Sequence, residues 1–172
     1  IRANATSDGG YKDDSGYDQQ KTILRHDYQR QAWDFRTVLD TANLKQDTAG
    51  FIAGYNAFQD SDLKRSNPNP DAYRDAWSVR LYSAASKSLT ESSTLTLTPY
   101  LRANNMDFLQ HFLAWQPVEE NAHDSLGLRT TVHTDAGALR WVNGIDMEYT
   151  DATLQETQDE DFNPNIPAGV HY

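Results

Sequence analysis

Apolar and polar side chains alternate in two runs within residues 76–104, and this pattern constrains the fold more than any other feature of the chain. Successive side chains of a β-strand point to opposite faces, so each run predicts one strand of about ten residues. A polar turn at residues 86–93 joins the two runs. Strands of globular sheets average about five or six residues. The pattern therefore predicts an unusually long amphipathic hairpin, with one apolar face formed by Trp77, Val79, Leu81, Leu95, Leu97 and Leu101.

Weaker alternation elsewhere predicts further strands, about seven in all. They are expected at residues 2–6, 19–29, 33–42, 125–133 and 138–150. Short turns near Arg30, Ser88 and Gly137 alternate with long segments, chiefly residues 7–17, 43–75, 105–123 and 151–172. Transmembrane barrels have this arrangement because short turns lie on one side of the membrane and long loops on the other. The predicted fold is all-β: part of an antiparallel transmembrane β-barrel with long extracellular loops.

Composition and charge exclude several classes of function. The formal charge is −10, from 25 acidic and 15 basic residues, and binding to nucleic acid requires a basic face instead. The chain has no cysteine, and its five histidines lack the spacing of a metal site. Glu119 and Glu120 are adjacent, so on a strand they point to opposite faces and on a loop they are usually exposed to solvent, and neither case forms a catalytic pair. We expect no enzyme activity, no cofactor and no metal centre.

A soluble β-sandwich that binds carbohydrate is the main alternative. Aromatic residues near the predicted strand ends suit the interfacial girdle of a barrel, but they are also found in sandwich cores. The two folds differ in which way the leucines face. In a sandwich the leucines pack inside and the threonines face out, whereas in a barrel the leucines face lipid. A non-specific porin is a further alternative within the membrane class.

Three segments resemble the barrel region of TonB-dependent outer-membrane receptors: residues 9–21 (GGYKDDSGYDQQK), 67–80 (NPNPDAYRDAWSVR) and 98–128 (TPYLRANNMDFLQHFLAWQPVEENAHDSLGL). The resemblance implies a plugged barrel of about 22 strands, of which this chain supplies roughly seven. Such receptors import scarce, bulky nutrients, most often ferric siderophores and sometimes haem, cobalamin or sugars. We therefore expect residues 1–172 to be a section of a longer bacterial outer-membrane protein.

The same resemblance implies a set of partners. They are a small metal chelate such as a ferric siderophore, the outer-membrane lipid, and TonB, which is contacted through a plug domain. Nothing in these residues matches the plug or the segment that TonB grips.

Ligand contacts are expected on the long loops, because long loops often carry binding residues. Aromatic side chains there can stack on a siderophore or haem, Gln110 and His111 can donate hydrogen bonds, and Arg74 can pair with an anionic chelate. The alternative is that these loops fold down and their side chains pack on neighbours. The candidate ligand-binding residues are Tyr55, Phe58, Tyr73, Arg74, Phe108, Gln110, His111 and Trp115.

Overall fold

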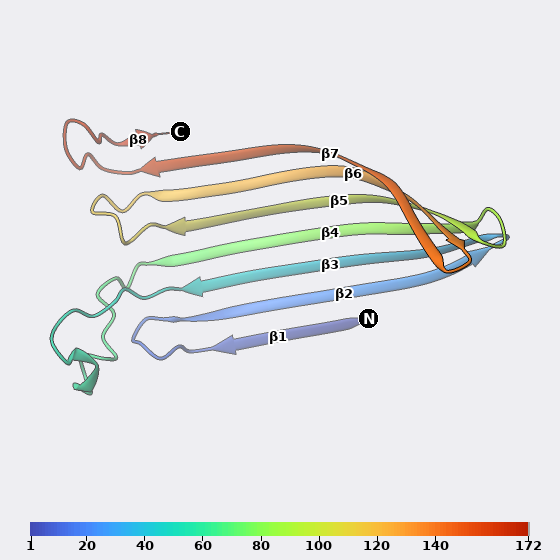
Figure 1. Cartoon of the computed structure of the whole chain (residues 1–172). Coiled ribbons are helices and arrows are strands. Elements are labelled where there is room, and N and C mark those ends of the chain that lie inside the picture. Colours follow the sequence, from blue (N-terminus) through green and yellow to red (C-terminus); the bar gives the residue numbers. More distant parts are fainter. Residues whose placement is uncertain (172) are drawn as a thin grey trace.

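The chain forms one antiparallel sheet in which every strand pairs with the next along the sequence (Figure 1). This is a computed structural model that describes residues 1–171. The strands are β1 (Arg2–Asp8), β2 (Gly16–Arg30), β3 (Trp33–Asp47), β4 (Tyr73–Ser88), β5 (Ser93–Leu109), β6 (Val118–Ala136), β7 (Leu139–Gln158) and the two-residue β8 (Gly169–Val170). A single 3-10 turn, η1 (Ala57–Gln59), is the helical element of the described residues. The sheet is not closed: β1 and β8 pair on one side only.

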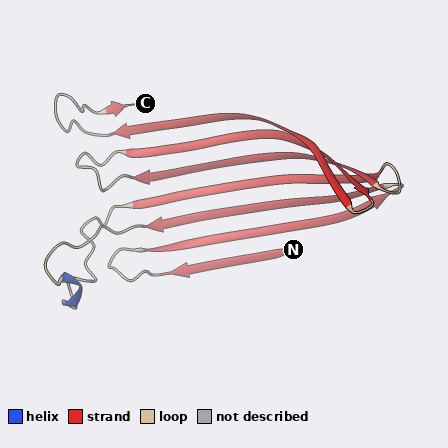
Figure 2. Ribbon diagram, viewed as in Figure 1, coloured by secondary structure: helices blue, strands red, loops and turns tan. Residues whose placement is uncertain are grey.

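Short turns and long loops lie at opposite ends of the sheet, as the sequence predicts (Figure 2). The turns at residues 31–32, 89–92 and 137–138 form one end, named here the turn end. The loops at residues 9–15, 48–72, 110–117 and 159–168 form the other, the loop end. Gln31 and Gly137 have φ of 54° and 65°, the left-handed conformation that two-residue hairpin turns require.

The strands are longer than predicted, and all four predicted loops are correspondingly shorter. β2 to β7 contain 15 to 20 residues each. Residues 105–109 continue β5 and residues 118–123 begin β6, so the predicted 105–123 loop shrinks to residues 110–117. Residues 151–158 likewise continue β7. Near the loop end polar and apolar residues occur on both faces, as at residues 104–109 (NNMDFL), so apolar–polar alternation disappears while backbone pairing continues.

One face of the sheet is apolar over a band of about nine residues per strand. In register, Leu39 pairs with Leu81, Leu81 with Leu101, and Leu101 with Leu126. Nothing covers this face among residues 1–171, and Leu126 and Ile145 remain 59% and 68% exposed. Among the described residues, the buried apolar side chains are Ala57, Ala72 and Pro117, which all lie in loops at the loop end. The leucines therefore face outward from a single layer, and no second sheet forms the sandwich of the alternative among these residues.

The ladder between β4 and β5 is interrupted once, in the middle of the apolar band. On β4, pairing with β5 runs from Arg74 to Tyr82 and resumes at Ala85. Ser83 and Ala84 therefore have no partners on β5, where Pro99 and Thr98 lie opposite them. Proline has no backbone N–H to donate to a ladder. No helical segment among residues 1–171 combines the length and hydropathy needed to cross a bilayer.

Candidate functional site

The face opposite the apolar band carries paired charges along the middle of the sheet. The Tyr100 hydroxyl on β5 donates to Glu148 (2.9 Å) and Asp146 (3.2 Å) on β7. Arg102 forms an ion pair with Glu148, and Arg129 of β6 donates to Asp146 at 2.7 Å. These side chains cross three neighbouring strands. The polar face is thus held together by its own cross-strand network, because each acidic group of the network has a basic or hydroxyl partner.

Gly127 makes this network possible. It lies on β6 directly between Tyr100 of β5 and Glu148 of β7. A Cβ at Gly127 would collide with the Tyr100 ring and hydroxyl. Because glycine leaves that space empty, the tyrosine lies across β6 and its hydroxyl reaches the carboxylates of the next strand.

A hollow of about 530 Å³ opens on the polar face beside this network. Two of its arginines, Arg80 and Arg102, are direct cross-strand partners. Arg102 has a buried Nε with no hydrogen-bond partner among the described residues. Three arginines against two carboxylates give the hollow a positive excess. Its lining residues are Arg80, Tyr82, Ala84, Thr98, Tyr100, Arg102, Arg129, Asp146 and Glu148.

Three of the predicted ligand-binding residues meet at the loop end of the polar face. Arg74 of β4 pairs in register with Phe108 of β5, and its guanidinium lies 5.6 Å from the centre of that ring. Phe108 in turn pairs with Glu119 of β6. The side chain of Gln110, which is buried, donates to Glu119 at 2.6 Å, and its backbone N–H donates to Pro117 at 2.9 Å. Gln110 therefore holds the 110–117 loop closed, so its amide is already occupied by the protein.

The other predicted ligand-binding residues do not join this cluster. Tyr55 and Phe58 are 96% and 68% exposed on the 48–72 loop, which extends away from the sheet (Figure 1). His111 packs against Phe112 at 5.8 Å between ring centres, and Trp115 lies 6.1 Å from Phe162 of the 159–168 loop. Tyr73 points to the opposite face from Arg74, because adjacent residues of a strand alternate.

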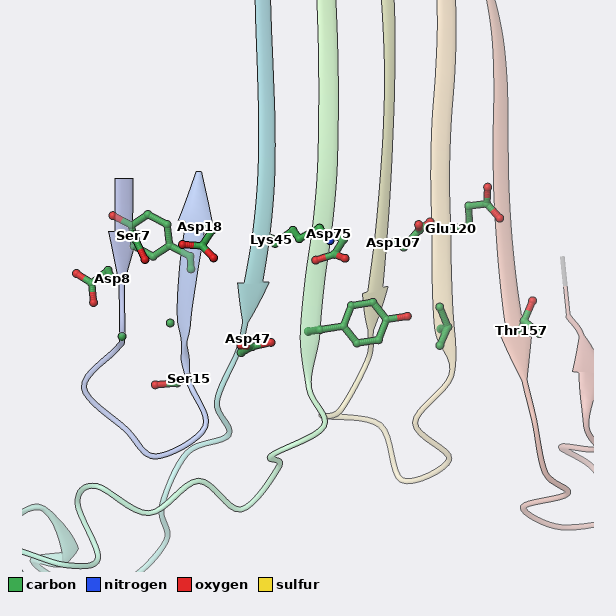
Figure 3. Close-up of a pocket in the computed structure, with 15 residues that line it drawn as sticks. Ser7, Asp8, Ser15, Asp18, Lys45, Asp47, Asp75, Asp107, Glu120 and Thr157 are labelled. Atoms are coloured by element: carbon green, nitrogen blue, oxygen red, sulfur yellow. The ribbon is translucent and has the colours of Figure 1, made fainter. Parts of the chain in front are cut away.

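Tyr73 instead lines a hollow of about 1020 Å³ at the loop end of the apolar face (Figure 3). Asp75, Asp107 and Glu120 follow one another in register across β4, β5 and β6 there. Burial, and then the neighbouring Glu120 and Asp75, raise the pKa of Asp107. Burial, followed by Asp107 and other nearby carboxylates, also raises the pKa of Tyr73. Sequence reasoning missed this row because register brings together acids that are far apart in the chain: successive members of the row are 32 and 13 positions apart.

Glu119 and Glu120 lie on β6 rather than in the predicted 105–123 loop, and as neighbours on a strand they face opposite ways. Glu119 belongs to the Arg74 cluster on the polar face, and Glu120 lines the acidic hollow. Within residues 1–171 no group of three or more histidine or acidic side chains has an arrangement that could hold a metal ion. The chain matches no protein-family model and no curated protein.

Proposed function

We propose that this chain is a wall section of an outer-membrane β-barrel receptor that imports a bulky nutrient, with a ferric siderophore as the first candidate. The observation that carries the proposal is the two-faced single sheet. One face exposes a continuous apolar band, and the other carries paired charges. A single layer with an uncovered apolar face requires an apolar surrounding.

The dimensions of the apolar band support a bilayer as that surrounding. On β4 the band runs from Trp77 to Ala85, and on β5 from Leu95 to Ala103. Each is nine residues long, and a tilted strand needs about 9–11 residues to cross the hydrocarbon core. Aromatic side chains lie at the margins of the band, where amphipathic rings meet both lipid and water. They include Trp33, Tyr28 and Phe35 near the turn end and Trp77 and Tyr149 toward the loop end.

In this proposal the polar face lines the lumen and the loop end faces the outside. The Arg74–Phe108 cluster then lies near the outer mouth of the lumen, beside the loops that carry Tyr55, Phe58 and Trp115. An arginine over an aromatic ring suits an anionic chelate with flat aromatic groups, since it offers charge and a stacking surface together. We place the ligand contact there rather than at Gln110, whose amide already binds Glu119.

Uptake of radioactive iron tests the proposal. Cells that express the whole protein are given ⁵⁵Fe as catecholate, hydroxamate or citrate chelates. We expect uptake of one chelate class to require the protein, and R74A/F108A to lower that uptake about tenfold, because a charge contact and a stacking contact are both lost. K45A is the matched control: it removes a cation at the same height on the opposite face. No protein-dependent uptake of any chelate would contradict iron import.

A further inference from the structure

The loop between β3 and β4 is hydrogen-bonded to the loop between β1 and β2. The ammonium group of Lys12 donates to the carbonyl of Gly50 at 2.6 Å, and the backbone N–H of Asp13 donates to the carbonyl of Arg65 at 2.7 Å. The guanidinium of Arg65 also lies 5.7 Å from the centre of the Tyr11 ring. The first and the last part of the β3–β4 loop are therefore both held against the β1–β2 loop.

The side-chain amide of Asn67 joins the two loops at four points, named here the Asn67 joint. Its oxygen accepts from the backbone N–H groups of Gly50 (3.2 Å) and Asn69 (3.0 Å). Its nitrogen donates to the carbonyls of Asp14 (3.0 Å) and Thr48 (3.3 Å). These four bonds use both acceptor positions and both N–H donors of an amide. A carboxylate lacks the donors and an aliphatic side chain lacks both kinds of group, so the joint is specific to an amide.

Beyond the joint, the tip of the β3–β4 loop is a run of overlapping turns. The tip includes η1 and lies away from the sheet (Figure 1). The backbone N–H of Gln59 donates to the carbonyl of Asn56 at 2.9 Å, and that of Lys64 donates to the carbonyl of Asp60 at 3.1 Å. These bonds fix the local shape of the tip. Its position relative to the sheet then depends on the joint and on the contacts with the β1–β2 loop.

Three aromatic side chains of this ordered loop remain in contact with water. Phe51, Tyr55 and Phe58 are 84%, 96% and 68% exposed. An exposed ring gains little hydrophobic stabilisation from folding. Exposed apolar side chains gathered within residues 51–58 of an ordered loop indicate an interaction surface.

We propose that Asn67 is a positioning residue that holds Phe51, Tyr55 and Phe58 as a preformed aromatic platform. The platform receives an aromatic group of the ligand without the loop having to close over it. Because the joint orders the loop before the ligand arrives, binding costs less conformational entropy. The inference rests on the proposed function for the identity of the ligand. The joint itself can be tested independently of transport.

Distances between two nitroxide labels on the whole protein test the joint. Labels at S61C on the loop tip and T153C on β7 report where the tip lies relative to the sheet. Double electron–electron resonance should give one narrow distance distribution, which N67A makes about twice as broad because the loops then open locally. N67D should act like N67A, since a carboxylate keeps the acceptors but loses the donors. N165A, which removes an exposed asparagine side chain, is the control. A T98C/T153C pair lies within the sheet and should be unchanged in N67A.

The kinetics of ⁵⁵Fe uptake test the platform. For whichever of the catecholate, hydroxamate and citrate chelates is imported, N67A should raise the KM about fivefold at an unchanged maximal rate, because the rings must then be ordered during binding. In the F51A/Y55A/F58A background, which has no rings to position, N67A should have no further effect on the KM.

Each other outcome overturns a stated part of the inference. A broad S61C/T153C distribution without any change at Asn67, or a narrow one that persists in N67A, overturns the joint but leaves the import proposal standing. A broader distribution in N67A with an unchanged KM overturns the positioning role. If no chelate is imported, the proposed function and the platform both fail, while the label distances still decide whether Asn67 holds the two loops together.

Discussion

At the scale of single residues, the cross-strand network of the polar face depends on a glycine, Gly127. Tyr100 lies over Gly127 and connects β5 to the carboxylates of β7, bypassing β6. Glycine in a strand normally weakens it, because it packs nothing and costs more backbone entropy. Here the tyrosine ring covers the gap, so the cost is offset by a ring contact and two hydrogen bonds. Neighbouring charges of the network are held in place by the same hydroxyl.

Replacing Gly127 should therefore destabilise the protein even though alanine has the better strand propensity. We expect G127A to lower the free energy of unfolding by about 1–3 kcal/mol, the usual cost of overpacking, because its Cβ displaces Tyr100. Guanidinium unfolding of the protein in lipid vesicles measures this change. G9A is the control, since a Cβ there meets nothing within 4 Å. When Tyr100 is already replaced by alanine, the added G127A substitution should lower the free energy of unfolding much less. An equal loss with and without Tyr100 would refute the mechanism.

At the scale of elements, the sequence predicts strands where the apolar band lies and loses them beyond it. The hairpin of β4 and β5 is evident from Trp77 to Leu101 because residues of the apolar face and of the polar face alternate there. Beyond the band polar and apolar residues occur on both faces, so hydropathy no longer distinguishes strand from loop. This is why the ends of β5, β6 and β7 were predicted as loop. The hydrogen bond from Gln110 to Glu119 left no sequence signal for a related reason: it depends on register across the turn.

Pro99 is a weak point in that hairpin. It interrupts the β4–β5 ladder beside Ser83 and Ala84, within the apolar band. In the proposed bilayer setting, water could not replace the missing backbone hydrogen bond there. We expect P99V to restore the ladder and raise the free energy of unfolding by about 1 kcal/mol, because valine keeps the apolar surface and adds an N–H donor. Slower amide exchange at residues 97–100 would show the repair directly. A less stable P99V would mean that the rigid proline ring itself is needed there.

At the scale of the whole molecule, the candidate site could be predicted only in part. Arg74 and Phe108 were chosen as separate loop residues, and they meet because β4 and β5 pair in a register that brings residue 74 opposite residue 108. The acidic row of Asp75, Asp107 and Glu120 has the same origin and left no local signal. Register depends on turn geometry and on which face is buried. Contacts between residues that are far apart in the chain are therefore the part of a site that cannot be predicted from one sequence.

The orientation of the two faces is the property on which the membrane proposal depends, and the chain is well suited to test it. It contains no cysteine, so a single nitroxide label can be placed at Leu101 on the apolar face or at Thr98 on the polar face of β5. With the whole protein in lipid vesicles, we expect collisions with oxygen to dominate at L101C and collisions with a water-soluble nickel complex at T98C. This follows because oxygen concentrates in hydrocarbon and the nickel complex in water. A label at Thr90, in the turn between β4 and β5, gives the aqueous reference.

If L101C were shielded from both reagents, the leucines would be packed inside protein, as in a sandwich. If it matched T98C, both faces would meet water, and in either case the barrel-wall proposal would fail.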